Sequence, residues 1–252
     1  MVIGWVRHED EQFQAAESAW ARVEAAQRLK RLPCLLVPQP AHAVLAGELA
    51  TCLTCFGDLP PMIQRAIQMH DTGWAASDAQ QIQRLRCEDS HAAPVSFVAI
   101  PAAEVEKAWI ASIETVEAFS KPGAAIISRH FSLLAQHDQK VHQRFLQAEK
   151  SRQQRLGGSP EDLERWTAAL GFCDIVSLYL LSGLGREVEL RLAHPASAQA
   201  PHAARVSLQI EIGKLRFLPE ITRPGCVLSI QALKHPVPSQ GPRAETLTWE
   251  VQ

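Results

Sequence analysis

Apolar residues in the first 185 positions recur mostly at the spacing of three or four residues that marks an amphipathic helix. The pattern predicts helices over residues 9–30, 41–56, 61–70, 103–119, 123–136, 138–156 and 160–182. Two short apolar runs, at 2–6 and 34–37, predict strands. The stretch 75–103 has no clear period and contains Pro94 and Pro101, which indicates a long irregular loop. Loops of this length are often functional.

After Gly185 the pattern changes to alternation, in which apolar residues such as Val188, Leu190 and Leu192 are separated by polar ones. Alternation is typical of half-buried strands. It predicts strands over 188–192, 206–212, 215–218, 227–233 and 247–251, with a hairpin loop at 194–205. The expected fold class is mainly α: a helical bundle with a small antiparallel β-region at the C-terminus. We expect an N-terminal strand and helix (1–33), a helical domain (34–185) and a β appendage (186–252) packed on it.

The composition narrows the class of protein. A chain of 252 residues that is 46% hydrophobic and 21% charged can bury a full core as a soluble globular protein. Its net charge of −2 gives no drive toward nucleic acid or an anionic membrane. With no export signal and no membrane-length apolar run, we expect a cytoplasmic protein. Six scattered cysteines then indicate buried thiols and not a disulfide framework.

Candidate chemistry begins at His70-Asp71, where a nitrogen ligand and an anionic oxygen ligand are adjacent. On a helix these side chains would diverge by about 100°. Both can reach one ion only where the helix ends, and Gly73 supplies such an end. A helix-terminal pair that only hydrogen-bonds is the alternative.

Three more polar residues lie in apolar helical settings. His42 is in the first turn of a predicted helix, and His130 interrupts a largely apolar one. Asp174 lies in a nearly wholly apolar helix, where an unpaired carboxylate is costly to bury. It needs a cation, a strong hydrogen-bond network, a buried arginine or exposure to solvent. Two imidazoles and two carboxylates suit a divalent transition metal (Mn, Fe, Co, Ni or Zn) better than calcium. Such a metal can lower the pKa of bound water.

The order His42, His70-Asp71, Asp174 resembles the ligand pattern of the HD-domain superfamily of metal-dependent phosphohydrolases. More closely, five motifs spread over about residues 33–252 resemble a bacterial family of unknown function: Gln39-Pro-x-His42-Ala-x-Leu-Ala-Gly47, His70-Asp-x-Gly-Trp74, Ser128-Arg-His-Phe131, Phe145-Leu-x-x-Glu149-x-x-Arg-Gln153 and Asp174-x-x-Ser-Leu-Tyr179. The HD likeness implies an HD-domain-like helical bundle in which those four residues bind metal, while His130 or Asp71 handles a proton. The chain differs in having Thr-Gly-Trp after His-Asp, where phosphodiesterase-type HD proteins commonly have Gly-Lys.

Further residues are candidates for supporting roles. Asp78 is placed to hydrogen-bond a site histidine and set its tautomer, or to act in an ordinary turn. Arg129 and Arg152 could clamp an anionic substrate, or belong to a solvated basic face over 129–155. Glu149, three residues before Arg152, could instead form a structural ion pair with it.

The leading functional hypothesis is metal-dependent hydrolysis of a small phosphorylated or otherwise anionic molecule. The rivals are a non-catalytic HD-like binding scaffold and a dinuclear iron oxygenase of the HD type, in which His91 would complete a four-histidine set. The expected partner is a small-molecule substrate, and the sequence leaves a homo-oligomer open. Few aromatic residues are interleaved with basic ones, which argues against nucleic acid.

Overall fold

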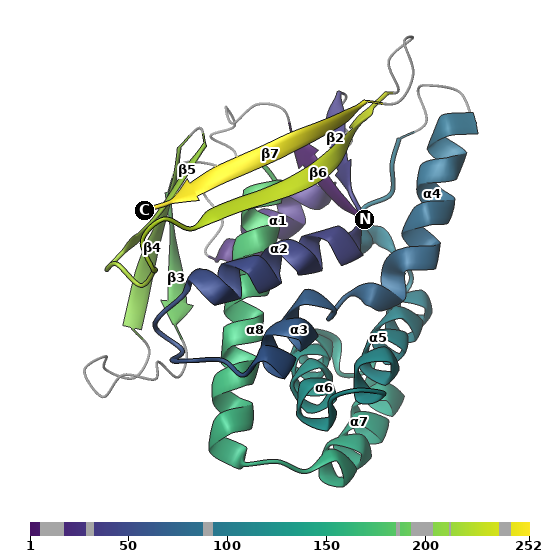
Figure 1. The fold of residues 1–252 in the computed structure, drawn as a ribbon. Coiled ribbons are helices and arrows are strands. Elements are labelled where there is room, and N and C mark those ends of the chain that lie inside the picture. Colours follow the sequence, from purple (N-terminus) through teal and green to yellow (C-terminus); the bar gives the residue numbers. More distant parts are fainter. Residues whose placement is uncertain are drawn as a thin grey trace.

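The computed structural model describes residues 1–5, 18–28, 33–87, 93–184, 187–192, 204–211, 213–236 and 243–252. Within them, a group of helices lies beneath a curled sheet (Figure 1). The helices are α1 (Ala19–Arg28), α2 (Gln39–Cys52), α3 (Pro61–Gln68), α4 (Ala75–Cys87), α5 (Ala102–Glu117), α6 (Lys121–Ala135), α7 (Gln143–Leu156) and α8 (Pro160–Leu181), with short 3₁₀ turns η2 (Thr72–Trp74), η3 (Phe97–Ala99) and η4 (Gln136–Asp138). No described helix combines the length and the apolar character needed to cross a membrane.

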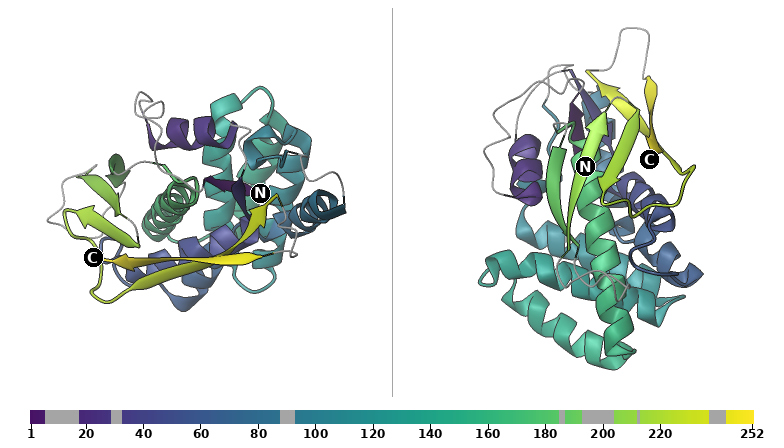
Figure 2. Two further views of the ribbon diagram at one scale, coloured as in Figure 1. Left: turned by 90° about the horizontal axis from the view of Figure 1, so that it is seen from above. Right: turned by 90° about the vertical axis from the view of Figure 1, so that its left-hand side faces the viewer.

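The sheet has seven strands in the order β1-β2-β6-β7-β5-β4-β3. Their bounds are β1 (Val2–Trp5), β2 (Cys34–Val37), β3 (Glu187–Leu192), β4 (Ala204–Glu211), β5 (Lys214–Leu218), β6 (Val227–His235) and β7 (Ala244–Val251). Neighbours pair antiparallel except β5 and β7, which are parallel. Figures 1 and 2 show the sheet curling over α2 and the C-terminal half of α8.

This arrangement corrects the expected fold class. The protein is a mixed α and β protein, and not a mainly α bundle with a small C-terminal β-region. The difference comes from β2, which is buried along its length and hydrogen-bonds to β6 with Leu36 opposite Leu233, while β1 pairs along its other edge. The sequence predicts both N-terminal strands, but their pairing with a strand some 200 residues away leaves no local signal.

The second wrong expectation is the loop at 75–103, because residues 75–87 form α4. Its sequence is rich in glutamine, arginine and alanine, which favour a helix by propensity without an apolar period. Among the side chains of α4 that the structure describes, Leu85 and the partly buried Ile82 contact a small apolar cluster with Met1, Ile3 and Leu36. Residues 88–92, which include His91, lie outside the described part of the chain.

Close contact between α2 and α3 places two elements of the candidate site side by side. Gly47 on α2 makes it feasible, since a Cβ there would lie 2.1 Å from Cγ and 3.0 Å from Cα of Gln68. The long helix α8 packs against α2 and α6. Ser159 caps α8, accepting a hydrogen bond from the backbone N–H of Asp162. These contacts bring α2, α3, α6 and α8 together around one buried point.

Candidate metal centre

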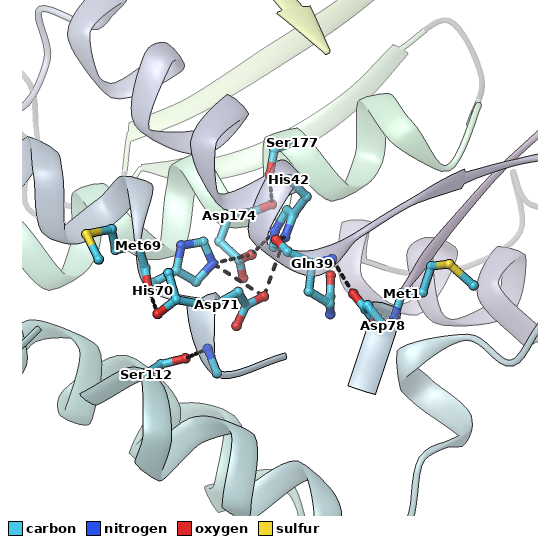
Figure 3. A network of polar contacts seen from close by, with 12 residues as sticks. Met1, Gln39, His42, Met69, His70, Asp71, Asp78, Ser112, Asp174 and Ser177 are labelled. Carbon is cyan, nitrogen blue, oxygen red and sulfur yellow. Dashed lines mark hydrogen bonds and ion pairs between the residues drawn. The ribbon is translucent and has the colours of Figure 1, made fainter. Parts of the chain in front are cut away.

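Four of the predicted metal ligands converge from separate elements (Figure 3). His42 comes from the first turn of α2 and Asp174 from the middle of α8, while His70 and Asp71 lie in the turn between α3 and η2. Each of the four residues is at most 7% exposed. His130, on α6, is also buried, and its Nε2 lies 3.4 Å from Oδ2 of Asp174.

The turn that carries His70 and Asp71 leaves the helical path at Met69, whose φ and ψ are −114° and 4°. The two side chains therefore point to the same side, as expected for a pair at a helix end. Gly73 has a different role from the predicted one, because α3 ends before it. Gly73 lets η2 rest against α5: a Cβ there would lie 2.0 Å from the carbonyl oxygen of Ala108. Its N–H donates to Oγ of Ser112 at 2.9 Å.

The backbone fixes the tautomers of both site histidines. Nδ1–H of His42 donates to the carbonyl oxygen of Gln39 at 2.9 Å, and Nδ1–H of His70 donates to that of Ile67 at 2.7 Å. In a neutral imidazole the other ring nitrogen then carries the lone pair. Nε2 of His70 is buried and has no hydrogen-bond partner among the described residues. Both Nε2 atoms are thus preset as metal ligands or as sites for an added proton.

Asp174 faces both of these nitrogens. Its Oδ1 lies 2.8 Å from Nε2 of His42 and 3.4 Å from Nε2 of His70. Burial alone would raise the pKa of Asp174, but its close contacts with His130, His42 and His70 hold that pKa well below its usual range. The carboxylate is therefore ionised. An anion facing two nitrogen lone pairs is unfavourable unless a cation, either a proton or a metal ion, lies between them.

Asp71 completes the charge pattern. Its Oδ2 lies 3.7 Å from Nε2 of His70 and 3.4 Å from Nδ1 of His42. Burial raises the pKa of Asp71 against the opposing effect of the two histidines. Burial also tends to lower the pKa of His70, yet the charge of Asp71 and the contact with Asp174 raise it to about 9. Without a metal, the centre therefore draws in protons to balance its carboxylates.

The same geometry fits a divalent metal. One ligand atom from each of His42, His70 and Asp71 lies within 4.8 Å of the others. Asp174 fits the same group, because its Oδ1 lies 2.8 Å from Nε2 of His42 and 3.4 Å from Nε2 of His70. Metal–ligand bonds of about 2.1 Å place neighbouring ligand atoms about 3 Å or more apart. The unpartnered Nε2 of His70 is the buried atom that such an ion would satisfy.

Asp78 supports this centre indirectly. Its Oδ2 accepts a hydrogen bond from the backbone N–H of Gln39 at 2.6 Å, and its Oδ1 lies 2.9 Å from the amino group of Met1. No described contact joins it to a site histidine. Because the carbonyl oxygen of Gln39 accepts a hydrogen bond from His42, Asp78 helps to fix the residue that orients that imidazole.

The predicted anion clamps lie away from the centre. Arg152 pairs with the buried Glu149 at 3.1 Å and with Glu117 at 3.2 Å, joining α5 to α7. This matches the ion-pair alternative. Arg129 lines a separate cavity of about 550 Å³ on the other side of His130, where its Nη1 is buried without a described partner. The cavity that contains the four candidate ligands is lined, among the described residues, by neither Arg129, Arg152 nor Glu149.

Replacing Arg152 by Ala is expected to destabilise the protein and leave metal affinity unchanged. Glu149 is 1% exposed, so the variant leaves a buried carboxylate without this partner. Such a loss lowers the free energy of unfolding by about 3–5 kcal/mol. Urea denaturation and metal titration measure the two effects. Arg155→Ala is the matched control, because Arg155 pairs with Glu117 at the surface and its loss should change stability far less. A stable Arg152→Ala protein with weakened metal binding would contradict the structural role.

The four ligands lie in the wall of a cavity of about 320 Å³. Its aromatic lining was not predicted as functional, because each such residue is indistinguishable from a core residue in the sequence: Trp20, Trp74, Phe97, Trp109 and Phe131. Trp109 stacks on Phe131 with ring centroids 5.1 Å apart. His142 is also part of this wall and is partly buried there, where its Nδ1 lies 2.7 Å from Oε1 of Glu106.

A buried cluster of histidine and aspartate at the edge of an aromatic cavity, beneath a curled mixed sheet, defines a mixed α and β protein with a candidate metal centre. The chain belongs to the family described as "Protein of unknown function (DUF3891)", whose model matches residues 27–217. This confirms the expected membership of a family of unknown function. Searches of curated proteins and of solved structures found no match. The HD likeness stays a prediction.

Proposed function

We propose that this protein is a metal-dependent hydrolase of a small molecule. The observation that carries the proposal is the fixed orientation of His42 and His70, whose Nδ1–H groups are held by backbone carbonyls so that their Nε2 lone pairs face Asp174. Backbone or carboxylate acceptors on the far nitrogen are the usual companions of metal-binding histidines. A purely structural histidine has no need for a lone pair aimed at a carboxylate.

In this proposal His42, His70, Asp71 and Asp174 hold a divalent transition metal. When bound, such an ion supplies a Lewis acid and makes water a nucleophile near neutral pH. Two of the chain's groups are placed to hold a proton. Nε2 of His130 lies 3.4 Å from Asp174, and Oδ2 of Asp71 faces both site histidines. Aromatic side chains form much of the rest of the cavity wall and offer few hydrogen-bond partners to water there.

Metal addition and removal test the proposal. After treatment with EDTA, Mn²⁺, Fe²⁺, Co²⁺, Ni²⁺ or Zn²⁺ at a hundred times its Kd should stabilise the protein by about 2.7 kcal/mol. For a chain of this length that corresponds to a rise in Tm of roughly 5–10 °C. Calcium is the control, because it prefers an all-oxygen site. Hydrolysis of a panel of carboxylic and phosphoric esters should appear with the metal and disappear with EDTA.

The rival functions give other results. If none of these metals changes the Tm and no ester is hydrolysed, the hydrolase proposal is contradicted and a binding scaffold is favoured. Two iron ions per chain would favour the dinuclear oxygenase instead. Elemental analysis of the protein as purified separates one bound metal from two.

A further inference from the structure

We infer that the ligand of this cavity is an uncharged, largely apolar molecule and not a phosphorylated one. The inference rests on the proposed function only for the reaction that the ligand undergoes. It departs from the anionic substrate that the sequence suggests, and it rests on what surrounds the centre. Besides the four candidate ligands, the polar residues in the cavity lining are Glu24, Gln39, His130, His137 and His142.

The other lining residues are apolar and come from six elements, α1, η2, η3, α5, α6 and α8, together with Ile100. Trp20 of α1 and Phe97 of η3 lie with ring centroids 6.2 Å apart. Trp109 and Val105 of α5 and Leu134 of α6 extend this surface. A flat aromatic or branched aliphatic group can be buried against such a wall with little loss of hydration, whereas an ionised group there would lose its water without replacement.

The charged side chains that line the cavity would not attract an anion. The lining includes the carboxylates of Glu24, Asp71 and Asp174 and five histidines, but no described lysine or arginine. Phosphate sites in proteins use arginine, lysine or free N–H groups at a helix start. At the start of α2 the N–H of Gln39 already donates to Asp78. At the start of α5, which begins at Ala102 in the wall, Glu104 already places a negative charge in the first turn.

The arginines that could serve an anion are used elsewhere. Arg152 and Arg155 are paired with glutamates between α5 and α7, and Arg129 faces the separate cavity behind His130. A bound metal would be the one strong cation available to a phosphate, and the two aspartates that hold it offset its charge. The binding energy for a ligand therefore has to come from the apolar wall.

A matched pair of probes tests this on the protein loaded with the metal that stabilises it most. The probes are 4-nitrobenzyl alcohol and 4-nitrobenzyl phosphate, which differ only in the charged group. Their nitro group quenches tryptophan fluorescence, and Trp20, Trp74 and Trp109 line the cavity. We expect the alcohol to bind at least tenfold more tightly than the phosphate. Equal or tighter binding of the phosphate, or no binding of either probe, would overturn the inference.

Variants that add a cation to the wall locate the binding. Leu134→Arg should reverse the preference, weakening the alcohol and strengthening the phosphate by about tenfold each. Leu133→Arg is the control, because this neighbouring residue is 53% exposed and does not line the cavity. If Leu134→Arg fails to fold, Val98→Lys in η3 places the charge on a half-buried part of the same wall. An unchanged preference in the folded wall variants would also overturn the inference.

The outcome separates this inference from the proposed function. Tight binding of the alcohol with no hydrolysis of any ester supports the apolar ligand and contradicts the hydrolase. Metal-dependent hydrolysis of phosphate esters with weak binding of the alcohol supports the hydrolase and contradicts the apolar ligand.

Discussion

Replacing Asp174 by Asn is expected to abolish tight metal binding while the protein stays folded. The change removes one of two carboxylates and is expected to weaken affinity for Mn²⁺ or Zn²⁺ on the order of 10²–10³-fold, as for a buried charge that loses its partner. Folding should survive, because the amide of the new side chain can donate to the lone pair on Nε2 of His42 that now faces the carboxylate. Isothermal titration calorimetry measures the affinity.

Asp162→Asn is the matched control for this variant. Asp162 lies on the same helix, α8, but near its start, where it pairs with Arg165 and its side chain is partly exposed. Its replacement should leave metal affinity unchanged. Asp174→Asn protein that binds metal as tightly as the unmodified protein would show that Asp174 is not a ligand.

Replacing Gly73 by Ala is expected to destabilise the protein strongly. The added Cβ would lie 2.0 Å from the carbonyl oxygen of Ala108, and only backbone movement of η2 or α5 relieves that overlap. Overpacking of this kind lowers the free energy of unfolding by about 3 kcal/mol. The melting temperature should therefore fall by roughly 6–12 °C. Because the displaced turn carries His70 and Asp71, metal affinity should fall with it.

Replacing Gly171 by Ala, on α8, is expected to have the opposite effect on stability. A Cβ there would lie 3.7 Å from Nδ1 of His130, an ordinary contact. In a helix interior alanine is favoured over glycine by up to about 1 kcal/mol, so this variant should be slightly more stable. If Gly73→Ala were as stable as Gly171→Ala, then η2 would not rest on α5 as described.

Local signals in the sequence predicted those elements whose cause is also local. Ser159 and Pro160 mark the start of α8, and alternation marks β3 to β7. The strand at 34–37 is confirmed with its predicted bounds. Helix α4 was missed because helix propensity, and not an apolar stripe, forms it. The place of β1 and β2 in the sheet depends on residues far along the chain, which no periodicity reveals.

The candidate site shows the same division. Single polar residues in apolar surroundings, His42, His130 and Asp174, were sufficient to select side chains that the structure brings together. Their tautomers could not be foreseen, because these depend on the carbonyls of Gln39 and Ile67. The role of Arg152 was open between clamp and ion pair, since spacing within α7 cannot show the glutamate that α5 contributes. The aromatic wall was missed because tryptophan in a helix has the same appearance whether it faces a core or a cavity.

The position of β2 between β1 and β6 has a consequence for how the molecule is assembled. Strand β2 is synthesised early, but β6, which pairs with one of its edges, is synthesised about 190 residues later. That edge of β2 therefore stays unpaired until most of the chain has been made. Until then an apolar strand edge, Cys34–Val37, is open to pairing with other chains. A fragment that ends before residue 227 would keep that edge exposed permanently. The helices that carry the candidate metal ligands are therefore best isolated with the C-terminal strands attached.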